Sequence, residues 1–122
     1  MRKVRYYTMK DLFEKIDGDP NFITAIREIV HRIAKVAAPE KIILFGSTAR
    51  GDIGPDSDID LLVVKRIDKR RQLAKQIYKA LIGVGRAVDI IVVTPEDIEK
   101  YKDSRALVIA PAIREGKVIY AA

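Results

Sequence analysis

The sequence lacks cysteine altogether and contains a single histidine, His31. Without cysteine the chain can form no disulfide, no thiolate zinc site and no cysteine nucleophile, and one histidine argues against a histidine-based metal site. The sequence also has no apolar run close to the roughly 18 residues of a membrane-spanning helix, and no signal-peptide pattern opens it. We therefore expect a cytoplasmic protein without a membrane partner.

The composition indicates one small folded domain with a basic surface. The chain has 122 residues, of which 48% are hydrophobic, and this is enough for one ordinary core. Its 23 basic and 17 acidic residues give a net charge of +6. This charge favours anionic partners such as nucleic acid, nucleotides or an acidic protein surface. It does not choose among them, and a solvated basic surface explains it equally well.

The hydrophobic pattern predicts helices that alternate with strands. Asn21 and Thr94 are candidate N-caps, Pro95 suits a first helical position, and Pro111 implies a kink or a restart within the last helix. The expected helices cover residues 21–38, about 68–82, 95 to about 102, and about 104–115. The expected strands cover residues 41–45, 58–64, 87–93 and 117–120.

These elements predict a single small α/β domain with a mixed sheet packed against α-helices. The short connection at residues 46–57 predicts that the first two strands are antiparallel neighbours, and the helix after residue 64 predicts a parallel crossover to the third strand. Because strand 58–64 is apolar on both faces, we expect helices on both sides of the sheet. We assign residues 21–122 to this domain and residues 1–20 to an N-terminal extension, which could form a short strand or helix.

Three aspartates lie where two of the strands begin. Side chains two residues apart on a strand share a face, so Asp58 and Asp60 should project together. Asp89 lies near the start of the next strand, and a parallel arrangement would bring it to the same place. Such a cluster is unfavourable without a cation, and its oxygen-only ligands favour Mg²⁺ or Mn²⁺, which commonly bridge carboxylates and substrate phosphates.

A glycine–serine turn ends the first strand and could bind phosphate. Gly46 allows close approach of a ligand to the backbone, and Ser47 could begin a short helical turn whose free N–H groups attract anions. Arg50 adds a positive fork suited to phosphate. Alone, each of these features has a structural explanation, since Asp-x-Asp is common and Gly-Ser is usually only a turn. Their combination at strand ends favours a site for a nucleoside triphosphate.

The spacing of these motifs resembles that of the polymerase-β-type nucleotidyltransferases. Gly46-Ser47 is followed after ten residues by Asp58-Ile-Asp60 and later by Asp89 on a strand. The longer string GSTARG…SDIDLLVV is similar to the minimal, single-domain members of this superfamily, which act as antitoxins of HEPN-type ribonuclease toxins. The resemblance extends over about residues 22–120, and residues 1–20 are not part of it.

The resemblance implies a mechanism and a partner. Asp58, Asp60 and Asp89 would bind two Mg²⁺ ions, with Asp89 also helping to deprotonate the attacking hydroxyl, while Gly46 and Ser47 would hold the terminal phosphates of ATP. The reaction would transfer AMP from ATP to a hydroxyl of a partner HEPN toxin, in such systems that of a tyrosine. Because the chain is too short to carry its own acceptor domain, we expect a homo- or hetero-oligomer.

Other functions stay open at this point. The chain could be a non-catalytic antitoxin that acts by binding alone, or a nucleotidyltransferase that acts on RNA or a small molecule. The basic run of residues 65–71 is either a solvated helix face or an edge that attracts ATP or an acidic partner.

Overall fold

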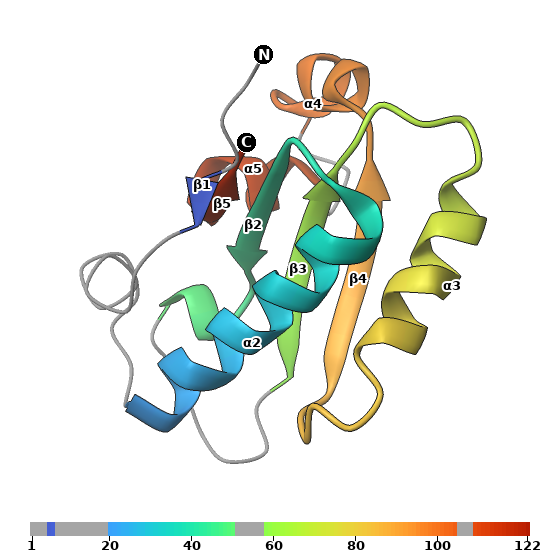
Figure 1. Cartoon of the computed structure of the whole chain (residues 1–122). Helices are drawn as coiled ribbons and strands as arrows, with labels where there is room; N and C mark the ends of the chain where they lie inside the picture. The colour runs from blue at the N-terminus through green and yellow to red at the C-terminus, as the bar shows by residue number, and fades with distance from the viewer. Residues whose placement is uncertain (1–4, 7–19, 51–57, 105–108) are drawn as a thin grey trace.

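A mixed β-sheet forms the middle layer of the protein, seen in a computed structural model that describes residues 5–6, 20–50, 58–104 and 109–122 (Figure 1). The strands are β1 (Arg5–Tyr6), β2 (Lys41–Phe45), β3 (Ile59–Val64), β4 (Val88–Val93) and β5 (Lys117–Ala121). The helices are α2 (Pro20–Ala37), α3 (Arg70–Ala80), α4 (Pro95–Tyr101) and α5 (Ile109–Glu115), with a 3₁₀ turn η1 (Thr48–Arg50) after β2.

The order of the strands in the sheet is β1-β5-β2-β3-β4. β2 pairs with β3 in antiparallel fashion, and β3 pairs with β4 in parallel. Both relationships confirm the sequence prediction. They follow from connection length, since a short loop joins antiparallel neighbours whereas a parallel pair needs a crossover such as α3. As a result β3 and β4 begin at the same end of the sheet, the lower end in Figure 1.

Helices cover both faces of the sheet, as the apolar pattern of β3 predicted. α2 and α3 pack on one face, where Ile59, Leu61 and Val63 contribute to a large core with the apolar side of α2. α4 and α5 lie on the other face, where Leu62 and Val64 join a smaller core. Alternate residues of β3 therefore point into two different cores. Asp60 shares its parity with Leu62 and so lies on the α4/α5 side.

Some helix boundaries differ from the predicted ones. Asn21 is not an N-cap, because α2 begins at Pro20, and proline is favoured in a first turn, where its missing N–H has no intrahelical partner. α3 is shorter than expected, at Arg70–Ala80. The predicted start of the last helix near Ser104 adjoins residues 105–108, which lie outside the described residues. α5 is described from Ile109, and Pro111 lies within it.

Two terminal features bear directly on earlier predictions. Thr94 caps α4 as expected, and its side chain and that of Asp97 form a reciprocal capping box with each other's backbone N–H groups. β1 pairs with β5, which confirms a short strand within the first 20 residues. The rest of the N-terminal extension lies outside the described residues, and the domain boundary at residue 21 stays a prediction.

Within the described parts of the chain, no helix is both long and apolar enough to cross a membrane.

Candidate active site

Asp60 and Asp89 stand opposite each other in the parallel register of β3 and β4. The negative charge of Asp89 raises the pKa of the Asp60 carboxyl, so the two carboxyl groups lie close enough to interact. Asp58 lies one residue before β3 and is exposed, and its charge acts on Asp60. The structure therefore brings the three predicted aspartates to one sheet end, with Asp60 and Asp89 as a close pair and Asp58 at its solvent side.

The electrostatics of this cluster oppose ionisation of Asp60. Partial burial raises the pKa of the Asp60 carboxyl most strongly, followed by the negative charges of Asp89 and Asp58. Burial and like charges both penalise the carboxylate form. A cation at this position would relieve both effects, so the cluster has the electrostatic character of a cation site.

Gly46 brings the backbone of the β2 turn against the same carboxylate. Phe45 is the register partner of Asp60, and Gly46 follows with φ of +76°, a conformation that glycine adopts at no steric cost. A Cβ atom added at Gly46 would collide with Oδ2 of Asp60. Only glycine fits this position without displacing Asp60, and its conformation aims the following turn at the carboxylates.

The turn after Gly46 has the short helical form that the sequence predicted. Ser47 is half-buried and leads into η1, whose first N–H groups have no acceptor within so short a helix. The backbone of Arg50 ends η1, but its side chain lies outside the described part of the structure, as do residues 51–57. The structure thus places Gly46 beside Asp60, with Ser47 directly after it. Phosphate binding by the Arg50 side chain stays a prediction.

Thr48 is a residue of this turn that the sequence did not single out. Its side chain is completely buried, and Oγ1 has no hydrogen-bond partner among the described residues. An unpaired buried hydroxyl costs roughly 1–3 kcal/mol, which makes it an unusual feature. The sequence holds no signal for it, because burial of Thr48 depends on how η1 packs beside β2. Arg86, two residues before β4, also buries a guanidinium nitrogen without a partner among the described residues, and its guanidinium lies over the ring of Phe22.

The residues present fit a magnesium ion that is completed by substrate. In the described ranges, no three aspartate, glutamate, histidine or cysteine side chains gather closely enough to hold a metal by themselves. Mg²⁺ usually binds through one or two carboxylates together with substrate phosphates rather than in an all-protein cage. The Asp60–Asp89 pair supplies that kind of ligand set, beside the backbone of Gly46.

The chain is similar to several known proteins. A profile of the family described as "Nucleotidyltransferase domain" matches residues 23–114 of this chain. A Methanocaldococcus jannaschii protein named "Putative protein adenylyltransferase" is 37% identical over 78 residues, which cover 62% of this chain and 77% of that protein. A crystal structure from Sulfolobus solfataricus, titled as a "putative nucleotidyltransferase", has 30% identity and a TM-score of 0.47, over 70% of this chain and 84% of the other.

Proposed function

This chain belongs to the nucleotidyltransferase domain family, and from that membership we propose that it is a Mg²⁺-dependent protein adenylyltransferase. It would transfer AMP from ATP to a tyrosine hydroxyl of a partner HEPN ribonuclease toxin and thereby act as an antitoxin. The observation that carries the proposal is the register pairing of Asp60 with Asp89 beside the backbone of Gly46. The name of the Methanocaldococcus relative supports a protein as the acceptor.

The proposed reaction is an in-line displacement at the α-phosphorus of ATP. The acceptor oxygen forms a bond to this phosphorus, the bond from the α-phosphorus to the β-bridging oxygen breaks, and pyrophosphate leaves. The proton of the acceptor hydroxyl would pass to Asp89, which is the register partner of Asp60 and is exposed to an incoming acceptor. When bound, Mg²⁺ would neutralise charge on the phosphates and on the displaced oxygen.

The roles of the other residues follow from their places around the pair. Asp60, with Asp58 at its solvent side, would hold magnesium, and Asp89 would complete the site. Gly46 and Ser47 would hold the terminal phosphates through the N–H groups of the turn, and Arg50 would add charge to the same end of ATP. The triphosphate would lie between the β2 turn and the starts of β3 and β4, which the register places at one sheet end.

The proposal includes a second protein chain and the cytoplasm as its location. The described helices and strands form one small α/β unit, and they include no further lobe that would hold an acceptor. A partner, either a toxin in a hetero-oligomer or a further copy of this chain, would supply that surface.

A transfer assay tests the proposal. The purified protein is incubated with Mg²⁺, each of the four labelled ribonucleoside triphosphates and a cell lysate, beside the variant Asp60→Asn/Asp89→Asn. We expect a labelled protein band that is lost in the double variant, is strongest with ATP and resists ribonuclease. Label in ribonuclease-sensitive material would assign the protein to RNA tailing instead, and label in a small molecule would assign a small-molecule transferase. Protection from the toxin without any aspartate-dependent label would favour an antitoxin that acts by binding alone.

A further inference from the structure

The outward side of α3 is strongly basic. α3 contains Arg70, Arg71, Lys75 and Lys79 and no acidic residue in its first turn, and Lys69 directly precedes it. Arg70 forms an ion pair with Asp97 at 2.7 Å. For the part of the chain that the structure describes, no carboxylate forms an ion pair with the other four cations. These cations therefore face solvent with their charge uncompensated.

The start of α3 is poorly suited to helix stability. Lys69 is at the N-cap position without a capping side-chain hydrogen bond, and Arg70 and Arg71 follow in the first turn. Cations here are repelled by the positive end of the helix dipole, whereas a stable helix start carries acids and a capping side chain. The stability of the helix start therefore does not explain this cluster of cations, whereas recognition of an anionic group would explain it.

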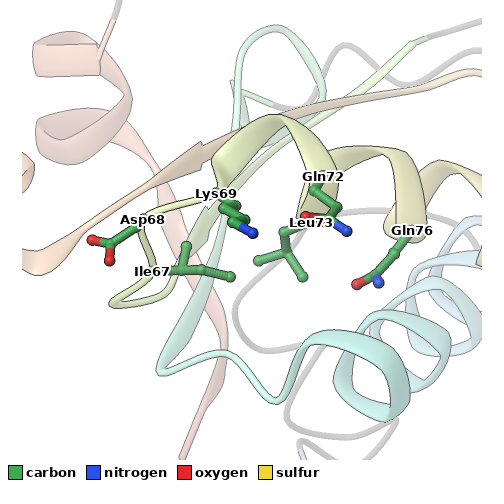
Figure 2. A pocket seen from close by; sticks show the side chains of 6 residues that line it. All are labelled: Ile67, Asp68, Lys69, Gln72, Leu73 and Gln76. Carbon is green, nitrogen blue, oxygen red and sulfur yellow. The ribbon is translucent and has the colours of Figure 1, made fainter.

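Open grooves accompany the cations. One, with a volume of about 430 Å³, is lined by Ile67, Asp68, Lys69, Gln72, Leu73 and Gln76. Figure 2 shows Ile67 and Leu73 close together on this surface, with Lys69 and Gln72 beside them and Asp68 turned away. A second groove, of about 790 Å³, continues past Arg71 to Lys75. The grooves thus offer apolar area flanked by positive and amide groups.

Exposed apolar residues lie beside the same cations. In the described residues the large hydrophobic side chains that are most exposed are Val36, Tyr78 and Ile82, at 44%, 43% and 76%. Tyr78 is on α3, where its hydroxyl accepts a hydrogen bond from the N–H of Ile90. Ile82 follows α3, and Val36 lines a third groove with Gln76 and Lys79. Apolar anchors surrounded by charge are typical of protein interfaces.

The end of α3 lies at the same end of the sheet as the proposed active site, although α3 packs on the opposite face from Asp60. The turn that contains Ile82 leads from α3 to β4, and Asp89 is the second residue of β4. In Figure 1 the last turn of α3 lies at the end of the sheet where β3 and β4 begin. The first turn of α3 lies near the opposite end, since the six residues of β3 span about 17 Å. Lys69 and Arg71 are therefore too far from Asp60 to hold the phosphates of the same ATP.

We infer that this surface, made of Lys69, Arg71, Lys75, Tyr78, Lys79 and Ile82, docks an acidic face of the protein acceptor. The inference rests on the proposed function, because it names the chemistry of the partner that the transfer reaction needs. Apolar groups of the acceptor cover Tyr78 and Ile82, and its carboxylates pair with the row Arg71, Lys75 and Lys79. These three residues are four apart in sequence, so successive cations are about 6 Å apart along the helix. Nucleic acid is the less favoured occupant because its phosphates would leave the apolar residues uncovered.

The test uses the labelled acceptor from the transfer assay, purified and titrated at constant Mg²⁺ and ATP. The variant is Arg71→Glu/Lys75→Glu, and the matched control is Lys41→Glu/Lys100→Glu, which changes the net charge equally at exposed residues outside α3. We expect the α3 variant to raise the KM for the acceptor about tenfold or more, corresponding to about 1.4 kcal/mol, with kcat nearly unchanged. The control should stay near wild type, and Mg²⁺ with ATP should stabilise both variants against heat as it does the wild type.

The outcomes separate the two proposals. An unchanged KM in the α3 variant, with transfer still dependent on Asp60, overturns the docking surface and leaves the function intact. Equal losses in the α3 variant and the control also overturn it, because they would show an effect of net charge alone. If the aspartate-dependent label is in RNA, the protein acceptor and its docking surface are both wrong. Absence of any aspartate-dependent label refutes the function, and the docking inference falls with it.

Discussion

Asp60 on β3 and Asp89 on β4 are register partners whose carboxyl groups interact electrostatically. The parallel pairing of two strands that are separated by a helix in the sequence creates this contact. Burial and the charges of Asp89 and Asp58 raise the pKa of Asp60, so the arrangement is unfavourable for the folded chain by itself. Function, rather than stability, explains why the carboxylates are held together.

The first prediction separates stability from activity at Asp60. Asp60→Asn should make the metal-free protein more stable at neutral pH, because it removes a partly buried charge that two other carboxylates repel. The same change should abolish nucleotide transfer. Thermal unfolding with and without Mg²⁺ plus ATP measures both effects, since a ligand that binds the native state raises the melting temperature. We expect ligand-induced stabilisation in the wild type and little in the variant. If Asp60→Asn were less stable than wild type and its melting temperature still rose with Mg²⁺ and ATP, the assignment of Asp60 to the magnesium site would be wrong.

The second prediction concerns the contact between Gly46 and Asp60. Gly46→Ala should lower stability and nearly abolish transfer, because its Cβ would collide with Oδ2 of Asp60 and would also require a positive φ. Gly83→Ala is the matched control, since Gly83 has φ of +86° but no atom within 4 Å of an added Cβ. The control should lose about 1–2 kcal/mol from backbone strain and keep its activity. Urea unfolding and the transfer assay on both variants make the comparison, and equal activities would argue against the collision.

Much of the fold was accessible from the sequence, for physical reasons that differ among the elements. β2 was predicted with its observed bounds because its apolar run ends at Gly46, which interrupts the strand. The capping of α4 was predicted because Thr94 and Pro95 act locally. The start of α2 was wrong by one residue, since Asn21 and Pro20 are both good helix beginnings and only tertiary packing chooses between them.

The sequence predicted where the carboxylates of the candidate site lie, but it did not predict how the residues around them are buried or exposed. Period-two alternation and a parallel crossover sufficed to place Asp58, Asp60 and Asp89 at one sheet end. The complete burial of Thr48 and the exposure of Ile82 depend on how η1 and the turn after α3 pack. Such packing has no local sequence signal. The basic run was visible in the sequence, but its pairing was not, since Arg70 finds Asp97 across 27 residues.

The third prediction concerns the pH dependence of α4. Asp97 accepts a hydrogen bond from the N–H of Thr94 and forms an ion pair with Arg70. Burial acts to raise the pKa of Asp97, but these two interactions outweigh it, so the pKa is lowered overall. A carboxyl with a lowered pKa stabilises the folded state fully above its unfolded value, here 3.8, and this contribution is lost as the pH falls through the folded pKa. Asp97→Asn should therefore cost about 1 kcal/mol near neutral pH and progressively less below about pH 4.

Urea unfolding over a series of pH values tests this prediction, with Asp68→Asn as the control at an exposed position outside α4. For Asp68→Asn, the difference from wild type in the free energy of unfolding should not shrink in this way as the pH falls. A cost for Asp97→Asn that stays constant down to acid pH would show that the lost hydrogen-bond geometry matters and the charge does not.

The fourth prediction is that Arg71 lowers the stability of the fold although it serves recognition of the partner. Because Arg71 is in a first turn that has no acid and no side-chain cap, Arg71→Glu should improve the interaction with the helix dipole and raise the free energy of unfolding by about 0.3–1 kcal/mol at low salt. The gain should shrink at high salt, where surface charges are screened, and Arg71→Gln should give a smaller gain. Urea unfolding at low and high ionic strength measures this. If Arg71→Glu is instead less stable, Arg71 contributes to the fold itself, and the excess of cations on α3 would no longer require a partner to explain it.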